Sequence, residues 1–170
     1  MNFYQDYANQ AKQYAIFPVI RSLEYTTLGL TSEICEMLLA GNGFDSKHFE
    51  DEQGDVWWYL AAVCDATDID FAAICEDLDP DPKVSYEQVV DHLIQGLRLL
   101  TGAVKKLIRD DNSVLSSVRT TRIRVGVGVR DIVSAMMELE PKHQRIMTAN
   151  LNKLESRKRR GVISGDGDNR

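Results

Sequence analysis

Apolar side chains recur every three to four residues over most of the chain, which is the spacing of an amphipathic α-helix. In the segment 22–40, for example, Leu30, Ile34 and Met37 fall on one face. A similar stripe runs from Phe49 to Val63. Bounded by proline, glycine and capping residues, this pattern predicts helices over approximately these ranges: 2–15, 22–40, 45–66, 70–78, 85–109, 115–139 and 141–157. The expected fold class is therefore all-α, an antiparallel helical bundle.

The strongest interruption is the run Asp79-Pro80-Asp81-Pro82, because proline cannot continue a helix and restricts the residue before it. Ser85 and Gln88 then have the spacing of a capping box that opens a long helix. Pro141 is expected in the first turn of the last helix. We therefore divide the chain into a first helical half, a linker, a second helical half and a basic, glycine-rich tail: 1–78, 79–84, 85–157 and 158–170.

The segment 122–130 (RIRVGVGVR) does not fit the helical pattern. Its apolar residues alternate at period two and two glycines interrupt it, which locally favours a strand. A single strand in a helical chain has no partner for its backbone hydrogen bonds, however. We therefore predict a helix here.

The two halves show a weak internal similarity. Residues 96–109 resemble 29–42, and the later run 130–140 repeats the acid-then-apolar order of 54–64. In this alignment Leu100 and Ala103 stand where the first half has Glu33 and Glu36. The second half is either a degenerate tandem repeat, which would make the chain a covalent pseudo-dimer, or an unrelated inserted helical hairpin.

Four acidic residues form the candidate site. Glu33 and Glu36 are three residues apart, as are Glu52 and Asp55, so each pair lies on one side of a helix. Fifteen residues lie between the pairs, and they include the break Gly41-Asn42-Gly43, which allows an antiparallel turn. The four carboxylates are then expected to converge across one seam between two helices.

Glu33 and Glu52 lie within the apolar stripes of their helices, where an unpaired charge is costly. The nearest basic residues in the sequence are Arg21 and Lys47. A bound cation is the simplest compensation, and an all-oxygen ligand set favours Mg²⁺, or Mn²⁺, over a redox metal. Di-iron bundles carry a glutamate-histidine motif on each of two helices, whereas here only Glu140 and His143 have that spacing.

Composition limits the other possibilities. The 170 residues are 44% hydrophobic, and no stretch approaches the roughly 18 apolar residues of a membrane span. The polar N-terminus lacks a signal-peptide core, so we expect a cytoplasmic protein.

The three cysteines lack zinc-finger spacing and are expected to be reduced and buried, whereas the three histidines are expected alone at the surface. The net charge of −6 makes nucleic acid an unlikely general partner.

The run Gly29-Leu-Thr-Ser-Glu-Ile-Cys-Glu36, followed by Glu52-Gln-Gly-Asp-Val-Trp-Trp-Tyr-Leu60, resembles the all-α nucleoside triphosphate pyrophosphohydrolases of the MazG-like group. The ending from Asn150 is similar to the C-terminal arm of phage and bacterial members, so the resemblance covers about 1–78 and 143–170. Ser32, Cys35 and Gln53 depart from the usual motif, but none replaces an acid.

The resemblance implies hydrolysis of a nucleoside triphosphate, with a deoxynucleotide favoured, to the monophosphate and pyrophosphate. It makes Glu33, Glu36, Glu52 and Asp55 both metal ligands and catalytic residues, and Glu36 or Glu52 the candidate to orient the attacking water. The number of ions and the base preference stay open. The candidate substrate-binding residues are two aromatic and three basic side chains: Trp58, Tyr59, Lys153, Arg157 and Arg160. The family also implies a homo-oligomer, with a dimer favoured.

Each of these candidates has a structural alternative. Trp58 and Tyr59 in a helix stripe are typical core residues, and the basic residues 153–160 are typical of a helix C-terminus. A second function from a different class is a non-catalytic helical adaptor that binds nucleic acid or an acidic partner through the basic C-terminus. That adaptor predicts no need for divalent ions and binding that weakens strongly with salt.

Overall fold

A computed structural model describes residues 2–40, 47–81, 83–110 and 115–162 of the chain. In these ranges the regular structure is helical, with no strand. Two short 3₁₀ turns, η1 (Lys12–Tyr14) and η2 (Val19–Arg21), connect the first two helices. The α-helices are α1 (Phe3–Ala11), α2 (Ser22–Ala40), α3 (Lys47–Thr67), α4 (Phe71–Glu76), α5 (Tyr86–Arg109), α6 (Leu115–Leu139) and α7 (His143–Arg159). The predicted all-α fold class is confirmed.

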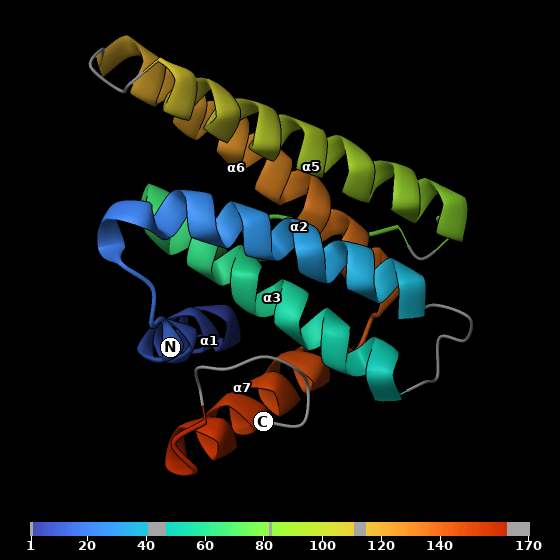
Figure 1. The fold of residues 1–170 in the computed structure, drawn as a ribbon. Helices are drawn as coiled ribbons and strands as arrows, with labels where there is room; N and C mark the ends of the chain where they lie inside the picture. Colours follow the sequence, from blue (N-terminus) through green and yellow to red (C-terminus); the bar gives the residue numbers. More distant parts are fainter. Residues whose placement is uncertain (1, 41–46, 82, 111–114, 163–170) are drawn as a thin grey trace.

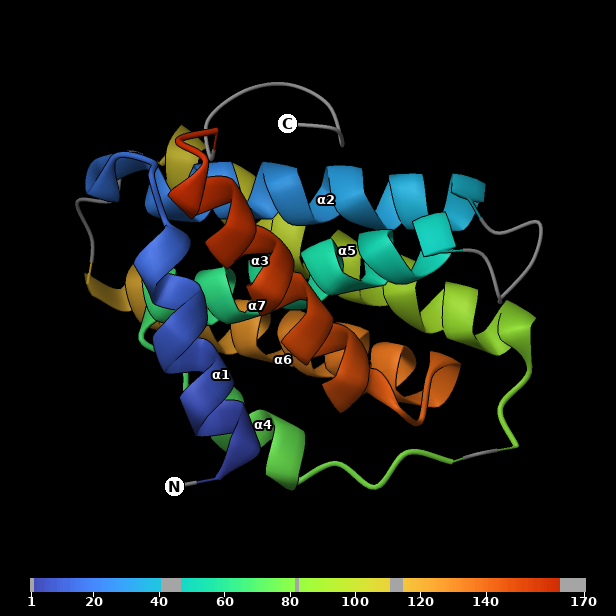
Figure 2. The ribbon, with the colours of Figure 1, turned by 90° about the horizontal axis from the view of Figure 1, so that it is seen from below.

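The helices form layers (Figure 1). The hairpin of α5 and α6 lies on one side of the pair α2 and α3, and α1 and α7 lie on the other side. Seen from below, α7 crosses α3 and has α1 beside it (Figure 2). The buried core is continuous through these layers, from Tyr7 of α1 through Trp57 of α3 to Leu100 of α5. The last helix therefore packs against the first half of the chain, although 75 residues separate it from α3.

Most of the expected helix limits agree with the structure. The capping box is present, with the Gln88 backbone N–H donating to Ser85 Oγ at 3.3 Å and the Ser85 N–H donating to Gln88 Oε1 at 3.0 Å. Pro141 is not in the first turn of α7, because it lies in a turn two residues before the helix begins at His143. The expected cap of the third helix at 45–46, the break at 41–43 and most of the tail lie outside the described residues.

The segment 122–130 is helical, as predicted against its local pattern. Its alternating apolar residues divide between two faces, since Val125 and Val129 are fully buried whereas Ile123 and Val127 are exposed. The glycines permit close helix packing rather than a strand. A Cβ on Gly128 would lie 2.8 Å from the backbone oxygen of Gly96 in α5, so the two backbones are almost in contact there.

The aromatic side chains around His143 attach α7 to the rest of the molecule. The His143 ring stacks on Tyr4 of α1 and contacts Trp57 of α3. Its Nδ1 donates to the Glu140 carbonyl at 3.2 Å, so Nε2 accepts from the Tyr4 hydroxyl at 2.8 Å. Burial lowers the pKa of His143. The expectation of a surface histidine is wrong here, because the neutral ring finds both polar partners inside the core.

The structure also bears on the cysteines and on the expected lack of a membrane span. Cys64 and Cys75 are buried as predicted, but Cys35 is exposed, since it lies one residue after the buried Ile34 on a helix and therefore points away from the core. No helix in the described ranges has the length and apolar character needed to cross a bilayer.

Candidate functional site

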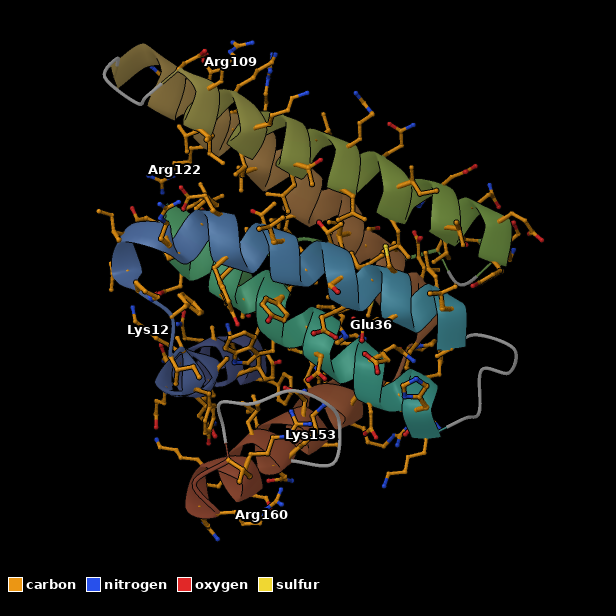
Figure 3. All side chains as sticks on the ribbon, viewed as in Figure 1. Lys12, Glu36, Arg109, Arg122, Lys153 and Arg160 are labelled. Atoms are coloured by element: carbon orange, nitrogen blue, oxygen red, sulfur yellow. The ribbon has the colours of Figure 1, made fainter. Side chains whose placement is uncertain are left out.

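The helices α2 and α3 bring three glutamates together. Glu33 and Glu36 of α2 and Glu52 of α3 each offer one carboxylate oxygen within 4.8 Å of the others. Glu52 is almost fully buried, Glu33 is half-buried and Glu36 is exposed (Figure 3 labels Glu36). The cluster therefore has a closed inner side and an open outer side. Glu36 also accepts a hydrogen bond from Ser32 Oγ at 2.8 Å, which holds it over the cluster.

This arrangement perturbs the pKa of Glu33. Burial, followed by the nearby charge of Asp55 and a hydrogen bond shared with Glu52, raises the pKa of Glu33 from 4.5 to about 8. A carboxyl with such a pKa stays protonated at neutral pH unless a positive charge approaches. Without a bound cation, the cluster therefore carries a proton on Glu33.

Asp55, the fourth predicted member, lies near Glu33 but outside the cluster of three glutamates, and it is held by α7. Its Oδ1 accepts from Asn150 Nδ2 and its Oδ2 from Lys153 Nζ, both at 2.6 Å. The Asp55 and Lys153 side chains are 18% and 23% exposed, so this ion pair is largely shielded from water. Neither partner could have been found by proximity in the sequence, since both lie about a hundred residues from Asp55.

Gly54 makes the close approach of α7 possible. A Cβ at this position would lie 2.9 Å from the Asn150 Cβ, so any larger residue would move α7 away from α3. Gly29 has the same relation to the ring of Tyr59, which lies flat against the α2 backbone. Both glycines of the acidic motif thus allow neighbouring side chains to support the carboxylates.

A cavity of about 100 Å³ opens next to Glu33 and Asp55. Its remaining walls are mostly aromatic or apolar and include one arginine: Tyr14, Ile16, Phe17, Tyr25, Trp58, Tyr59, Leu154 and Arg157. It has negative, positive and aromatic groups on different walls. Its aromatic walls suit a flat ring and Arg157 suits an anionic group, and at about 100 Å³ the cavity has room for only part of a drug-sized ligand.

The two aromatic candidates reach this cavity differently. Trp58 is 9% exposed and its indole N–H donates to the Ala11 carbonyl at 3.1 Å, so it is anchored as a core residue whose edge lines the cavity. Tyr59 is half-buried beside Tyr25, at 6.3 Å between ring centroids. Burial raises the pKa of Tyr59, and its phenol is therefore neutral.

The three basic candidates on α7 separate into two groups. Lys153 points toward α3, and Arg157, one turn later, is 6% exposed and lines the cavity. Arg160 is exposed at the C-cap of α7 and does not line the cavity (Figure 3). The structure thus brings Lys153 and Arg157 to the acids and leaves Arg160 at the end of the helix.

The positive charge beside the acidic motif comes from α7 and not from residues near it in the sequence. Lys153, rather than Lys47 or Arg21, pairs with the acidic motif. His48 was expected to stand alone, but its Nδ1 lies 3.3 Å from Glu52 Oε1 one helical turn away. His92 likewise lies 3.2 Å from Glu138 on the adjacent helix. The i, i+4 spacing of His48 and Glu52 was visible in the sequence and would have indicated the first pair.

The residues present fit a hard divalent cation. Two oxygens bound to one Mg²⁺ are at most about 4.2 Å apart, twice the usual bond length. The three glutamate oxygens lie within 4.8 Å of one another, so small side-chain rotations would let them share one ion. The buried and protonated state of the cluster is also what an ion would relieve.

Comparison with known proteins adds little to this picture. No family model matches the chain, and no solved structure matches it. Among curated proteins the chain is similar to Gene 37 protein of Mycobacterium phage L5, with 34% identity over 73 residues. That match spans 42% of this chain and 64% of the phage protein, so it covers less than two thirds of either. The name of the phage protein states no activity.

Proposed function

We propose that this chain is a Mg²⁺-dependent nucleoside triphosphate pyrophosphohydrolase. The observation that carries the proposal is the gathering of Glu33, Glu36 and Glu52 around one point, with one member buried and another protonated, beside a cavity lined by aromatic rings and Arg157. A purely structural cluster has no reason to combine buried acids with an adjoining open cavity. The motif resemblance in α2 and α3 supports the same activity.

In this proposal the role of each residue follows from its position in the site. Glu33, Glu36, Glu52 and Asp55 hold Mg²⁺ or Mn²⁺, which when bound neutralises the phosphates and activates water. Lys153 and Arg157 neutralise the phosphate chain from α7. Tyr59 and the edge of Trp58 accept the base. Water adds to the α-phosphorus and the bond to the bridging oxygen breaks, which releases pyrophosphate and the nucleoside monophosphate.

The test is a pyrophosphate-release screen over ribo- and deoxynucleoside triphosphates with Mg²⁺, Mn²⁺ or a chelator. Activity should require the ion. Glu36→Gln and Asp55→Asn should each lower the turnover number at least a hundredfold with unchanged helical circular dichroism. The matched control is Asp51→Asn, which removes an exposed charge from the same helix as Asp55 and should keep full activity. Full activity in both site variants would refute the assignment.

The chain is expected to act as a homo-oligomer in the cytoplasm, where nucleotides and Mg²⁺ are abundant. A row of exposed apolar side chains on η2 and the outer face of α2 supports a dimer through that face: Val19, Ile20, Tyr25, Leu28 and Leu39. Leu28→Glu should convert a dimer to a monomer in gel filtration. A monomer of the unaltered chain at high concentration would contradict this assembly.

A further inference from the structure

Positive charge in this acidic protein is concentrated in one part of the α5–α6 hairpin. Between residues 98 and 124 there are seven lysines and arginines but only two acidic residues. Of the 20 basic and 26 acidic residues in the whole chain, this leaves 13 and 24 for the rest. The net charge of −6 therefore combines about +5 in this segment with about −11 elsewhere. Such separation produces a strong local positive potential despite the overall sign.

Part of this charge forms a ridge on the outside of α5. Arg98, Lys105 and Arg109 are exposed and have the spacing of one helix face. Gly102 lies between them, and nothing is found within 4 Å of the position of a Cβ there, so the ridge is open to a partner. From Arg98 to Arg109 the helix rises about 16 Å, enough to follow about five phosphates of one DNA strand.

A groove between α5 and α6 continues the ridge. It has a volume of about 330 Å³, and its polar lining includes Lys106 and Asp110 of the α5 side and Thr120 and Arg124 of α6. Asp110 accepts two hydrogen bonds from Arg109, at 2.5 and 2.8 Å, so this pair adds no net charge, and Lys106 and Arg124 leave the groove positive. Lysine, arginine and threonine are the side chains that contact phosphate oxygens in nucleic-acid complexes.

We propose that this hairpin surface binds the phosphodiester backbone of a nucleic acid without sequence preference. The exposed apolar side chains of α5, Ile94 and Ile108, lie 14 residues apart, whereas a membrane-surface helix would need a continuous apolar face. An acidic protein partner would have to match an extended row of basic groups, and a regular phosphate backbone does so inherently. The surface does not include the acidic cluster, so this inference does not depend on the proposed hydrolysis.

The test measures the anisotropy of a fluorescein-labelled 20-base-pair DNA duplex, and of one of its strands, titrated with the full chain between 50 and 200 mM NaCl. EDTA is present throughout, so that divalent ions at the acidic cluster play no part. The hairpin variant combines Lys105→Gln, Lys106→Gln and Arg124→Gln. It should bind more than tenfold more weakly at 100 mM NaCl. The salt dependence, as the slope of log K against log salt, should fall by about two to three.

Two control variants remove charge elsewhere. The matched variant combines Arg21→Gln, Lys83→Gln and Lys142→Gln, three exposed positions outside the hairpin, and should bind as the unaltered chain does. Lys158→Gln with Arg159→Gln tests the basic end of α7. The proposal is overturned if the chain does not bind the DNA, if either control weakens binding as much as the hairpin variant, or if only anionic phosphatidylserine vesicles are bound. Pyrophosphate release by the hairpin variant should be unchanged.

Discussion

Replacing Glu33 by glutamine should stabilise the protein, by an amount that grows as the pH rises from 4.5 to about 8. The pKa of Glu33 rises from 4.5 to about 8 on folding, chiefly because the side chain is half-buried. Each pKa unit corresponds to about 1.4 kcal/mol, so a difference of about 3.5 sets an upper limit near 5 kcal/mol. Solvent reaches part of this side chain and screens the charge, so about 2 kcal/mol is the expected effect.

The sign follows from where the proton is held. Below pH 4.5 Glu33 is protonated in the folded and the unfolded chain, so its ionisation costs no stability. Between pH 4.5 and about 8 the unfolded chain loses the proton first, and the folded protein becomes progressively less stable as the pH rises. Glutamine never ionises. The variant should therefore match the unaltered chain near pH 4.5 and exceed it by the full amount above pH 8.

The assay is urea unfolding followed by circular dichroism, in EDTA, at pH 5 and at pH 9. A gain of about 2 kcal/mol at pH 9 corresponds to a melting temperature higher by roughly 4–8 °C for a chain of this size. Asp51→Asn is the control, since this exposed acid on the neighbouring helix α3 should give no difference between the two pH values. An equal effect of Glu33→Gln at both pH values, or a loss of stability at pH 9, would refute the reasoning.

Three further predictions concern the surroundings of the cluster. Gly54→Ala should destabilise the protein by about 1–3 kcal/mol in urea unfolding, because its Cβ would lie 2.9 Å from Asn150, and an unaffected midpoint would contradict this packing. Lys153→Met should raise the KM for nucleotide in steady-state kinetics by a larger factor than it lowers the affinity for Mg²⁺ in calorimetry. The substitution breaks the 2.6 Å ion pair with Asp55 but removes no metal ligand. With a thiol reagent such as Ellman's, one cysteine should react rapidly in the native protein, and Cys35→Ser should abolish that phase; three rapid thiols before urea is added would show that the other two are not buried.

The parts of this molecule that follow from local pattern could be predicted from the sequence. The stripe of Leu30, Ile34 and Met37 predicts both the helix and the position of Glu33 at the edge of its buried face, and the structure agrees. Glu52 was placed in the core by the same argument and is 2% exposed. The gathering of the glutamates needed only two helices and a turn between them.

Contacts between distant segments could not be predicted in this way. Nothing in the neighbourhood of Asp55 indicates that Lys153 will reach it, since that depends on how α7 crosses α3. The burial of His143 depends on ring partners from two other helices. Cys35 is a different case: it follows Ile34 directly, so the helical period itself placed it outside the core, and residue type was the poorer guide.

The stacked ring of His143 makes the docking of α7 sensitive to acid. The neutral ring accepts from the Tyr4 hydroxyl, and a proton on Nε2 would remove that acceptor within the core. Because the pKa of His143 is lowered on folding, its contribution to stability is present above its unfolded value, near 6.5, and is lost as the pH falls below it. Mild acidification should therefore loosen α7 before the other helices separate, and hydrogen exchange would show its amides losing protection first.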